Sequence, residues 1–328
     1  MLILNEQAVR AAFPMANAIE AMREVMLAHA QGHAYQPLRM VVQPPGVPGL
    51  GVIKPAATGT GTDVAMGLKV VTLFADNPQT HGLPAILGFV ALQDPDTGAP
   101  VAILDGAVVT EIRTGAASAV ATDLLANPGA GDLALFGAGV QARAHLAAMA
   151  EVRDLRRVRV WSRTRSSSER LAAWAAGAGF PTVEVCDAPA DAAAGADLVC
   201  TVTTASEPVL DGDWVAPGCH VNAVGAFQPA TRELATNLVT RAGAIVVDSR
   251  ESASAEAGDL LLPIAEGAMA RTDWPELGEL LLGKGGGRTS DDEITIYESL
   301  GLAIQDVAAA ARITSRAHEL GLGVDVDF

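Results

Sequence analysis

The sequence predicts an α/β fold in which a doubly wound parallel sheet is joined to a second part of α+β type. Three observations carry this prediction. From about residue 114 onward, single β-type runs alternate with alanine-rich helical stretches, which is the pattern of a parallel sheet. Before about residue 105, short β-type runs instead follow one another. A length of 328 residues also suits two domains better than one.

The first part begins with an amphipathic helix. After Pro14, the apolar residues Ile19, Met22 and Val25 recur at helical spacing, and Gly32 is a typical C-terminal stop. Strands are then predicted at 41–42, 51–53, 66–73, 85–92 and 101–105. Turn-forming residues at 94–98 join the last two strands and predict a hairpin. We therefore expect a largely antiparallel sheet.

The second part begins with an alanine-rich helix over 115–125, which the Asn-Pro-Gly run at 127–129 ends. Strands are predicted at 132–136, 158–161, 183–186, 197–202, 219–224 and 244–247, with helical stretches between most of them. A final helix over 299–317 follows the run 293–297.

The composition excludes several classes of protein. Half of the residues are hydrophobic and 18% are charged, which is typical of a globular chain. A net charge of -16 would repel nucleic acid. The three cysteines form no CxxC pair and the six histidines are scattered, so we expect reduced thiols and no metal site. The N-terminus lacks the pattern of a signal peptide and no 18-residue apolar run follows, so we expect a cytoplasmic protein without a membrane partner.

A glycine-rich turn predicts a dinucleotide site. Gly137, Gly139 and Ala142 follow an apolar strand and open a helix, which is the context that makes this pattern specific. Gly137 permits the tight turn, Gly139 lets a pyrophosphate approach the backbone, and Ala142 allows close packing of helix on strand. The first N–H groups of the helix would bind phosphate, so Ala138, Val140 and Gln141 join the predicted site. These residues predict a Rossmann domain that binds NAD(P).

The end of the second strand favours NADP(H), although NAD(H) stays possible. An acidic side chain at this point binds the ribose 2′-hydroxyl, whereas an arginine accommodates a 2′-phosphate. This chain has Ser162, Arg163 and Thr164 there, and no acid. The alternative is that Arg163 and Arg165 belong to a solvated loop. We also assign Val224 and Gly225, which follow a later strand, to the cofactor site.

Three basic residues outside the cofactor half predict a carboxylate site. Lys69 lies within an apolar strand, where a buried ammonium needs a partner or a lowered pKa. Arg39 and Arg113 could form the fork that binds a carboxylate, with Lys69 as the catalytic proton donor. The alternative for each is an ordinary surface charge. On weaker grounds, Thr114 and Asp306 could touch nicotinamide or substrate.

Several co-linear motifs resemble the ornithine cyclodeaminase/μ-crystallin family over nearly the whole chain. They lie at 67–71, 104–106, 110–118, 137–139, 222–226, 292–295 and 299–301. The resemblance implies a substrate-binding and dimerisation domain made of 1–115 with 300–328, a Rossmann domain over 116–299, and a homodimer. It also implies that Arg39 and Arg113 bind the substrate carboxylate and that Lys69 contacts the carboxylate or the reacting nitrogen.

One departure from the family bears on the reaction. Cyclodeaminases carry an aspartate just after the glycine that corresponds to Gly225, and this chain has Ala226 there. Without that carboxylate the cyclodeaminase reaction lacks its proposed base. The chain looks more like the branch that reduces cyclic imines with a 2-carboxylate, such as delta-1-pyrroline-2-carboxylate and delta-1-piperideine-2-carboxylate, to proline or pipecolate.

Three alternatives stay open. An amino-acid dehydrogenase of the alanine type would use a similar site, and an ornithine cyclodeaminase is the least favoured enzyme. A non-catalytic protein that binds NADP(H) and a small ligand is the alternative from another class. In each case the partner is a small carboxylated imine or amino acid.

Overall fold

The computed structural model describes residues 1–61 and 63–327, and it divides into two compact units. The first unit is Met1–Arg113 with Gly301–Phe328, and the second is Thr114–Leu300. The sequence places the boundaries at 115 and 300, whereas the structure has them at 113 and 301. The functional roles of the two units stay predictions. None of the helices described over 1–61 and 63–327 is long and apolar enough to cross a membrane.

The first unit is built on an eight-stranded sheet. Its order is β15-β1-β7-β6-β5-β4-β2, with β3 also paired to β4. Only β1 and β7 pair in parallel among these neighbours, so the predicted antiparallel sheet is confirmed. Its elements are β1 (Leu2–Leu4), α1 (Glu6–Ala12), α2 (Met15–Ala30), β2 (Ala34–Tyr35), β3 (Met40–Val42), β4 (Leu50–Thr58), β5 (Ala65–Leu73), α3 (Asn77–Thr80), β6 (Ile86–Gln93), β7 (Pro100–Asp105), α12 (Ala303–Leu320) and β15 (Val324–Asp325).

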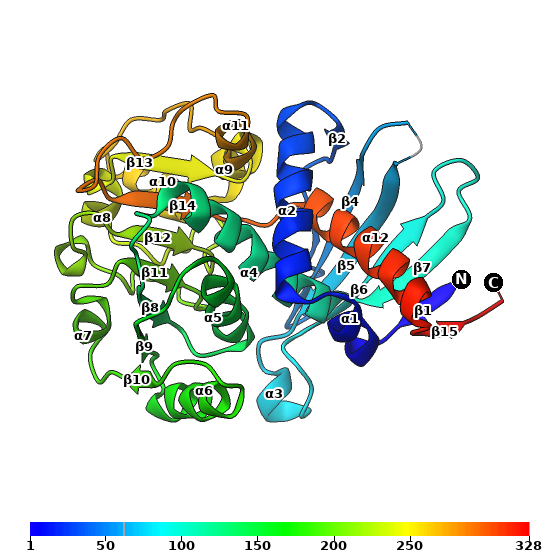
Figure 1. Ribbon diagram of the computed structural model, residues 1–328, viewed down its shortest axis with the longest axis horizontal. Coiled ribbons are helices and arrows are strands. Elements are labelled where there is room, and N and C mark those ends of the chain that lie inside the picture. Colours follow the sequence, from blue (N-terminus) through cyan, green and yellow to red (C-terminus); the bar gives the residue numbers. More distant parts are fainter. Residues whose placement is uncertain (62, 328) are drawn as a thin grey trace. The chain divides into compact units, whose positions relative to one another are not determined.

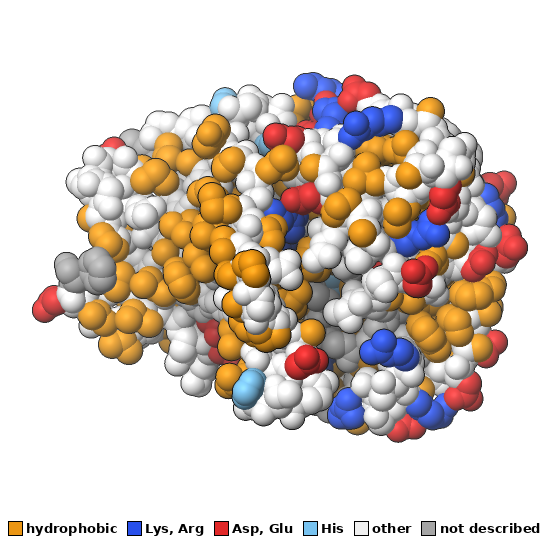
Figure 2. Space-filling view, turned by 180° about the vertical axis from the view of Figure 1, so that it is seen from behind, with side chains coloured by type: hydrophobic (Ala, Val, Ile, Leu, Met, Phe, Trp, Pro, Cys, Tyr) orange, Lys and Arg blue, Asp and Glu red, His pale blue; other side chains and the backbone are white. Residues whose placement is uncertain are grey.

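One face of this sheet is covered and the other is not. Helix α12 packs against α2 and against strands β4, β5 and β6, and Figure 1 shows both helices in front of the sheet. Figure 2 shows the face behind, where hydrophobic side chains gather over this unit. By the register of the strands, Met40 and Val42 on β3 and Leu87 and Phe89 on β6 lie on this face, and all four are exposed. A monomer rarely leaves such an apolar face in water.

The second unit contains a seven-stranded parallel sheet, which confirms the predicted Rossmann fold. The strand order is β10-β9-β8-β11-β12-β14-β13, and all neighbours pair in parallel. Its elements are β8 (Asp132–Phe136), α5 (Val140–Val152), β9 (Arg157–Trp161), α6 (Arg165–Gly177), β10 (Val183–Val185), α7 (Pro189–Ala193), β11 (Leu198–Thr201), η1 (Gly212–Trp214), β12 (His220–Ala223), α8 (Thr236–Arg241), β13 (Ala244–Val247), α9 (Arg250–Glu256), α10 (Gly258–Ala265), α11 (Leu277–Leu281) and β14 (Thr295–Glu298). Helix α4 (Gly106–Leu125) contains the boundary between the units.

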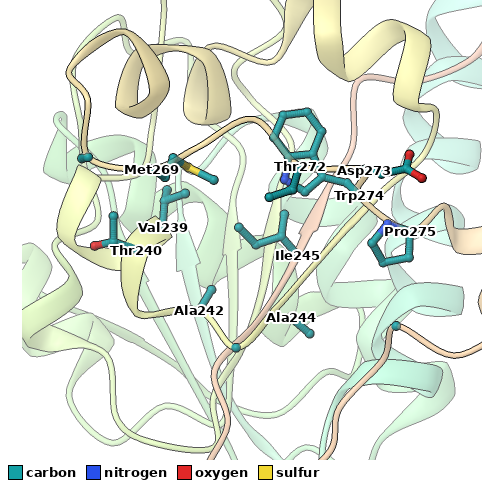
Figure 3. A pocket seen from close by; sticks show the side chains of 13 residues that line it. Val239, Thr240, Ala242, Ala244, Ile245, Met269, Thr272, Asp273, Trp274 and Pro275 are labelled. Atoms are coloured by element: carbon teal, nitrogen blue, oxygen red, sulfur yellow. The ribbon is translucent and has the colours of Figure 1, made fainter.

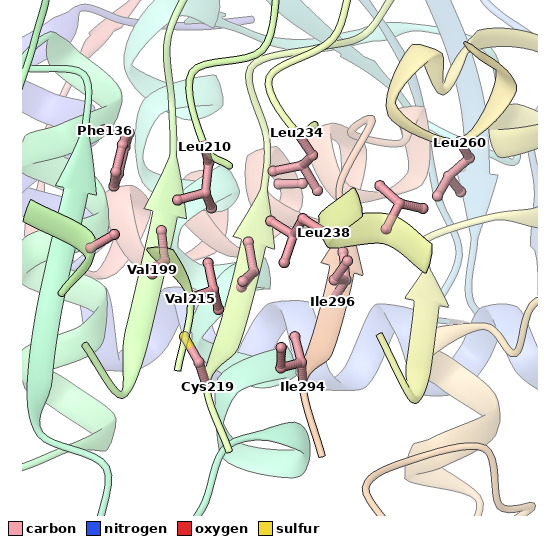
Figure 4. Packing of buried hydrophobic residues seen from close by; sticks show 14 of the residues in the cluster. Phe136, Val199, Leu210, Val215, Cys219, Leu234, Leu238, Leu260, Ile294 and Ile296 are labelled. Atoms are coloured by element: carbon pink, nitrogen blue, oxygen red, sulfur yellow. The ribbon is translucent and has the colours of Figure 1, made fainter. Parts of the chain in front are cut away.

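The core of the second unit lies on its central strands. Val199 on β11, Val221 on β12 and Ile296 on β14 are completely buried. Figure 4 shows Leu238 of α8 and Leu260 of α10 against the same cluster. Because these strands are buried along their length, their carboxyl ends are held in fixed positions at one edge of the sheet.

Three of the differences from the sequence prediction concern α4, α12 and β14. Helix α4 begins at Gly106 rather than 115, because the Asp105 carboxylate accepts hydrogen bonds from the N–H groups of Ala107 and Val108 and so caps the helix. The last helix begins at Ala303 rather than 299, after Gly301 with φ +74°. Residues 295–298 form β14, which no strand prediction covered, between β12 and β13.

Candidate functional site

The predicted cofactor residues lie mainly at one edge of the Rossmann sheet. Residues 137–141 follow the carboxyl end of β8, residues 162–164 follow β9, and Val224 with Gly225 follow β12. Parallel strands present their carboxyl ends at the same edge, and dinucleotides bind there. The structure therefore brings these residues to one edge. Thr114 is different, because it is buried within helix α4 and follows no strand of this sheet.

The glycine turn has the geometry that a pyrophosphate site needs. Gly137 has φ +110°, and a Cβ there would lie 2.8 Å from the Val202 carbonyl oxygen, so only glycine fits. Gly139 caps α5 with an ordinary extended backbone, and a Cβ there would meet no atom within 4 Å. The space in front of Gly139 is therefore open, at the N-terminus of a helix that favours anions.

These two glycines give a matched pair of variants. Gly139→Ala should leave the unfolding midpoint in urea unchanged but weaken dinucleotide binding at least about tenfold, because the methyl group fills the open space. Gly137→Ala should instead lower the stability, since it forces alanine into a left-handed backbone against Val202. Urea unfolding and calorimetric titration with NADPH measure the two effects. Equal loss of stability in both variants would contradict this assignment.

The end of β9 presents an unpaired arginine. The Ser162 hydroxyl donates to the Thr164 carbonyl oxygen at 2.9 Å and lies 2.9 Å from Ser168 Oγ, which orders the turn. Arg163 and Thr164 are exposed. Arg165 pairs with Glu169 and Asp187, whereas Arg163 makes no ion pair within residues 1–61 and 63–327. The Arg163 guanidinium is thus available to an anion.

A buried glutamate that sequence reasoning did not assign holds the Gly225 backbone. The Glu233 carboxylate accepts hydrogen bonds from the Thr203 N–H at 2.6 Å and the Gly225 N–H at 2.7 Å. A Cβ on Gly225 would lie 2.3 Å from the Thr203 carbonyl oxygen. Burial raises the pKa of Glu233, and the N–H groups that it accepts from oppose that rise. Glu233 therefore fixes the loop that follows β12.

The first unit assembles a buried cluster of charged side chains under α12. Lys69 Nζ lies 2.7 Å from Asp306 Oδ2 and donates to Thr110 Oγ1 at 3.1 Å. Arg113 Nε donates to Asp306 Oδ1 at 2.9 Å, and its Nη1 donates to Gln305 Oε1 at 2.9 Å. Lys69, Arg113 and Asp306 are each less than 5% exposed. The structure thus brings together two of the three predicted substrate residues and the weaker candidate Asp306.

The charges of this cluster shift one another's pKa values. Burial lowers the pKa of Lys69 to about 8, while Asp306 opposes this and Arg113 and Arg39 add to it. Burial alone would raise the pKa of Asp306, but Arg113, Lys69 and Lys54 outweigh it and hold that pKa below its usual value. A lysine whose pKa lies near neutral pH has the property that a general acid needs.

Two further residues belong to this cluster by their electrostatic effects. Arg39 is half-buried, and its charge acts on both Lys69 and Lys54. Lys54 was not predicted, although it is 6% exposed and its Nζ donates to the Gly301 carbonyl oxygen at 2.8 Å. A lysine among buried strand residues was the signal that found Lys69, and the same signal applies to Lys54.

One pocket of the second unit lies away from these residues. It has a volume of about 430 Å³ and adjoins the amino end of β13, with Ile245, Met269 and Trp274 in its wall (Figure 3). No predicted cofactor residue lines it. Within residues 1–61 and 63–327, no three His, Cys, Asp or Glu side chains are placed to hold a metal ion.

The Rossmann sheet with its open glycine turn defines a dinucleotide-dependent protein of the oxidoreductase class. The chain belongs to the ornithine cyclodeaminase/mu-crystallin family, whose model matches residues 1–321. The predicted family is thereby confirmed.

Three proteins illustrate the similarity. Ketimine reductase mu-crystallin of Mus musculus is 39% identical over 279 residues, which cover 85% of this chain and 84% of that protein. A second similar protein is Thermococcus litoralis Delta(1)-pyrroline-2-carboxylate reductase, whose structure was solved in complex with NADH and L-proline. The two structures superpose with a TM-score of 0.94 at 34% sequence identity, and the match covers 99% of this chain and 100% of that chain. An archaeal alanine dehydrogenase dimer with bound NAD has a TM-score of 0.92 and 31% identity, and covers 100% of this chain and 99% of that chain.

Proposed function

We propose that this protein is an NAD(P)H-dependent reductase of cyclic ketimine carboxylates, such as delta-1-pyrroline-2-carboxylate and delta-1-piperideine-2-carboxylate. The observation that carries the proposal is the buried ion cluster, in which Lys69 and Arg113 share the single carboxylate of Asp306. A buried cluster with more positive than negative charge is stabilised by an anionic ligand. The similarity to a ketimine reductase and to a pyrroline-2-carboxylate reductase supports this substrate class.

The residues of the chain have separate roles in this reaction. Arg113 and Arg39 bind the substrate carboxylate and so fix the position of the imine carbon. Asp306 orients Arg113 and keeps Lys69 charged. Lys69 donates the proton that the ring nitrogen receives. The residues at the edge of the Rossmann sheet, with Gly139 at the pyrophosphate, hold the dinucleotide, which supplies a hydride to the imine carbon when it is bound.

The test of this proposal is direct. The purified protein, mixed with NADPH and delta-1-pyrroline-2-carboxylate, should consume the absorbance of the reduced cofactor and form proline. Delta-1-piperideine-2-carboxylate should be consumed in the same way. No turnover of either imine with NADPH or NADH would contradict the proposal.

Amino-acid dehydrogenation is the second candidate, and the similarity to an archaeal alanine dehydrogenase favours it. Such an enzyme would consume NADH with pyruvate and ammonia, and the same assay separates the two functions. Cyclodeamination is disfavoured, because Ala226 is buried and offers no carboxylate at the position of the family's proposed base.

We further propose that NADP(H) is the preferred cofactor. Arg163 is exposed and has no carboxylate partner among the described residues, so its guanidinium can bind a 2′-phosphate. Arg163→Ala should weaken NADPH binding about 10–100-fold, the range for hydrogen bonds to charged groups, and leave NADH binding unchanged. Arg165→Ala is the matched control, because Arg165 is already paired with Glu169 and Asp187. A higher kcat/KM of the wild type with NADH would overturn this preference.

The exposed apolar face of the first unit supports a homodimer. Phe89 on β6 is 40% exposed and lies on the sheet face that α12 does not cover. Phe89→Glu should therefore yield monomers by light scattering, since a buried charge without a partner is costly at an interface. Leu320→Glu at the end of α12 is the control and should stay dimeric. A monomeric wild type would rule out the proposal.

A further inference from the structure

Lys54 is a buried lysine in a chain that scarcely uses lysine. Lysine and arginine together number 22, and only three of them are lysines. Lysine is almost never fully buried, yet Lys54 and Lys69 are 6% and 2% exposed, and Lys284 is exposed. Arginine stays charged in a protein, whereas the pKa of a buried lysine shifts readily. The two buried positions therefore carry the residue that can change its charge.

The two buried lysines lie directly opposite one another. Strands β4 and β5 are antiparallel, and Lys54 pairs with Lys69 in their register. Side chains at such positions share one face, with Cβ atoms about 4.5–5.5 Å apart. The Lys54 Nζ donates to the Gly301 carbonyl oxygen, and a Cβ on Gly301 would lie 2.6 Å from Arg113 Nη1. The Gly301 backbone is thus close to both Lys54 and the Arg113 guanidinium.

The charges around Lys54 are unbalanced. Lys69 on β5, Arg113 on α4 and the half-buried Arg39 before β3 act on it as positive charges, and Asp306 on α12 is the one acid among these groups. Strands β3 and β2, which also pair with β4, contribute Met40–Val42 and Ala34–Tyr35 and no acid. Burial, followed by the positive charges of Arg39 and Lys69, lowers the pKa of Lys54 well below the usual lysine value. Like charges directly opposite on a sheet are unfavourable, and a neutral Lys54 removes that repulsion.

We propose that Lys54 is a further substrate-binding residue, which is a neutral amine in the ligand-free protein and takes up one proton when a carboxylate binds beside Lys69 and Arg113. The inference rests on the proposed function, because the carboxylate is that of the ketimine. One proton passes from solvent to Lys54 Nζ, and no covalent bond of the substrate changes. The new positive charge balances the negative charge of the carboxylate, so the buried site has the same net charge before and after binding.

The scarcity of lysine makes this directly measurable. In protein labelled with ¹³C at lysine Cε, the NMR spectrum has three lysine signals, which Lys54→Arg and Lys284→Arg assign. On saturation with pyrrole-2-carboxylate at pH 7.5, the Lys54 signal should move from the amine to the ammonium position. The Lys284 signal should stay at the ammonium position throughout. A Lys54 signal in the same state with and without the carboxylate would overturn the inference.

Calorimetry gives a second readout that does not depend on assignment. Titration of pyrrole-2-carboxylate in phosphate and in Tris buffer should show uptake of about one proton per site, from the difference between the two heats. Lys54→Arg keeps the charge without titrating, so it should lose most of this uptake while it still binds the carboxylate, whereas Lys54→Met should bind about tenfold more weakly. Undiminished uptake in Lys54→Arg would count against Lys54.

The outcomes also separate this inference from the proposed function. A wild type that reduces no ketimine but still protonates Lys54 on carboxylate binding would refute the reductase and support the proton-coupled anion site. A wild type that reduces the ketimine without a change at Lys54 would refute the inference alone.

Discussion

Lys69→Met should abolish ketimine turnover and leave dinucleotide binding intact. Methionine is an unbranched side chain of nearly the same length, but it cannot donate a proton or balance the charge of Asp306. General acid catalysis contributes about 10²–10⁴-fold, so kcat should fall by that factor. The residues predicted to hold the dinucleotide lie in the second unit, so the Kd for NADPH should stay within about twofold of the wild type. Kinetics with delta-1-pyrroline-2-carboxylate and calorimetry with NADPH measure the two effects.

Lys284→Met is the matched control for this variant. Lys284 is the one exposed lysine of the chain, and its loss removes the same charge without touching the cluster. It should have wild-type kcat and Kd. A Lys69→Met enzyme that retains kcat within about fivefold would show that water or another group protonates the substrate. A wild type with no turnover would instead favour a binding protein, which has no catalytic rate to lose.

The prediction of Lys69 shows what a sequence can reveal about a site. Lysine is rarely buried, so a lysine with apolar residues on either side in a predicted strand is unusual. The neighbouring residues alone therefore single out Lys69. Its partner Asp306 was only a weak candidate, because 237 positions separate the two residues and no local rule links them. A long-range ion pair depends on how α12 packs on the sheet, which periodicity does not specify.

Lys54 escaped prediction for a local reason. The predicted strand ended at residue 53, one position before Lys54, and proline is unusual inside a strand, as at position 55. In the structure β4 continues to Thr58, because β5 pairs with it over its whole length. On its other side, β3 pairs with it only over Gly51–Ile53 and β2 only over Ala57–Thr58. Pro55 lies in the stretch of β4 that pairs with neither β3 nor β2. The extension of β4 depends on its pairing with other strands, which the local sequence does not show, so Lys54 was not recognised as a buried strand residue.

The parallel sheet was predicted more completely than the ion cluster. Each of its outer and central strands has an apolar run between turn signals, and the glycine turn after β8 is a local feature. Strand β14 is the exception, because its four buried residues follow an acidic run and precede the last helix. Its insertion between β12 and β13 is a matter of chain topology, and no short pattern specifies that.

Asp306→Asn should both destabilise the first unit and move the pH dependence of turnover. Asparagine is nearly the same size, but it leaves the Arg113 guanidinium buried without its carboxylate. Removal of one partner from a buried ion pair costs about 3–5 kcal/mol, so the urea midpoint should fall clearly. Glu319→Gln on the same helix is the control, because the pair of Glu319 with Arg316 is exposed and should contribute little.

The pH profile separates a chemical role of Asp306 from a structural one. Lys69 can donate a proton only below its pKa, so wild-type kcat/KM should fall as the pH rises through about 8. Asp306 raises that pKa through its charge, so in Asp306→Asn the fall should begin at lower pH. Because both enzymes are assayed with the same ketimine, ionisation of the substrate affects the two profiles equally. A variant that is less stable but has an unmoved profile would show that Lys69 is not the group that titrates.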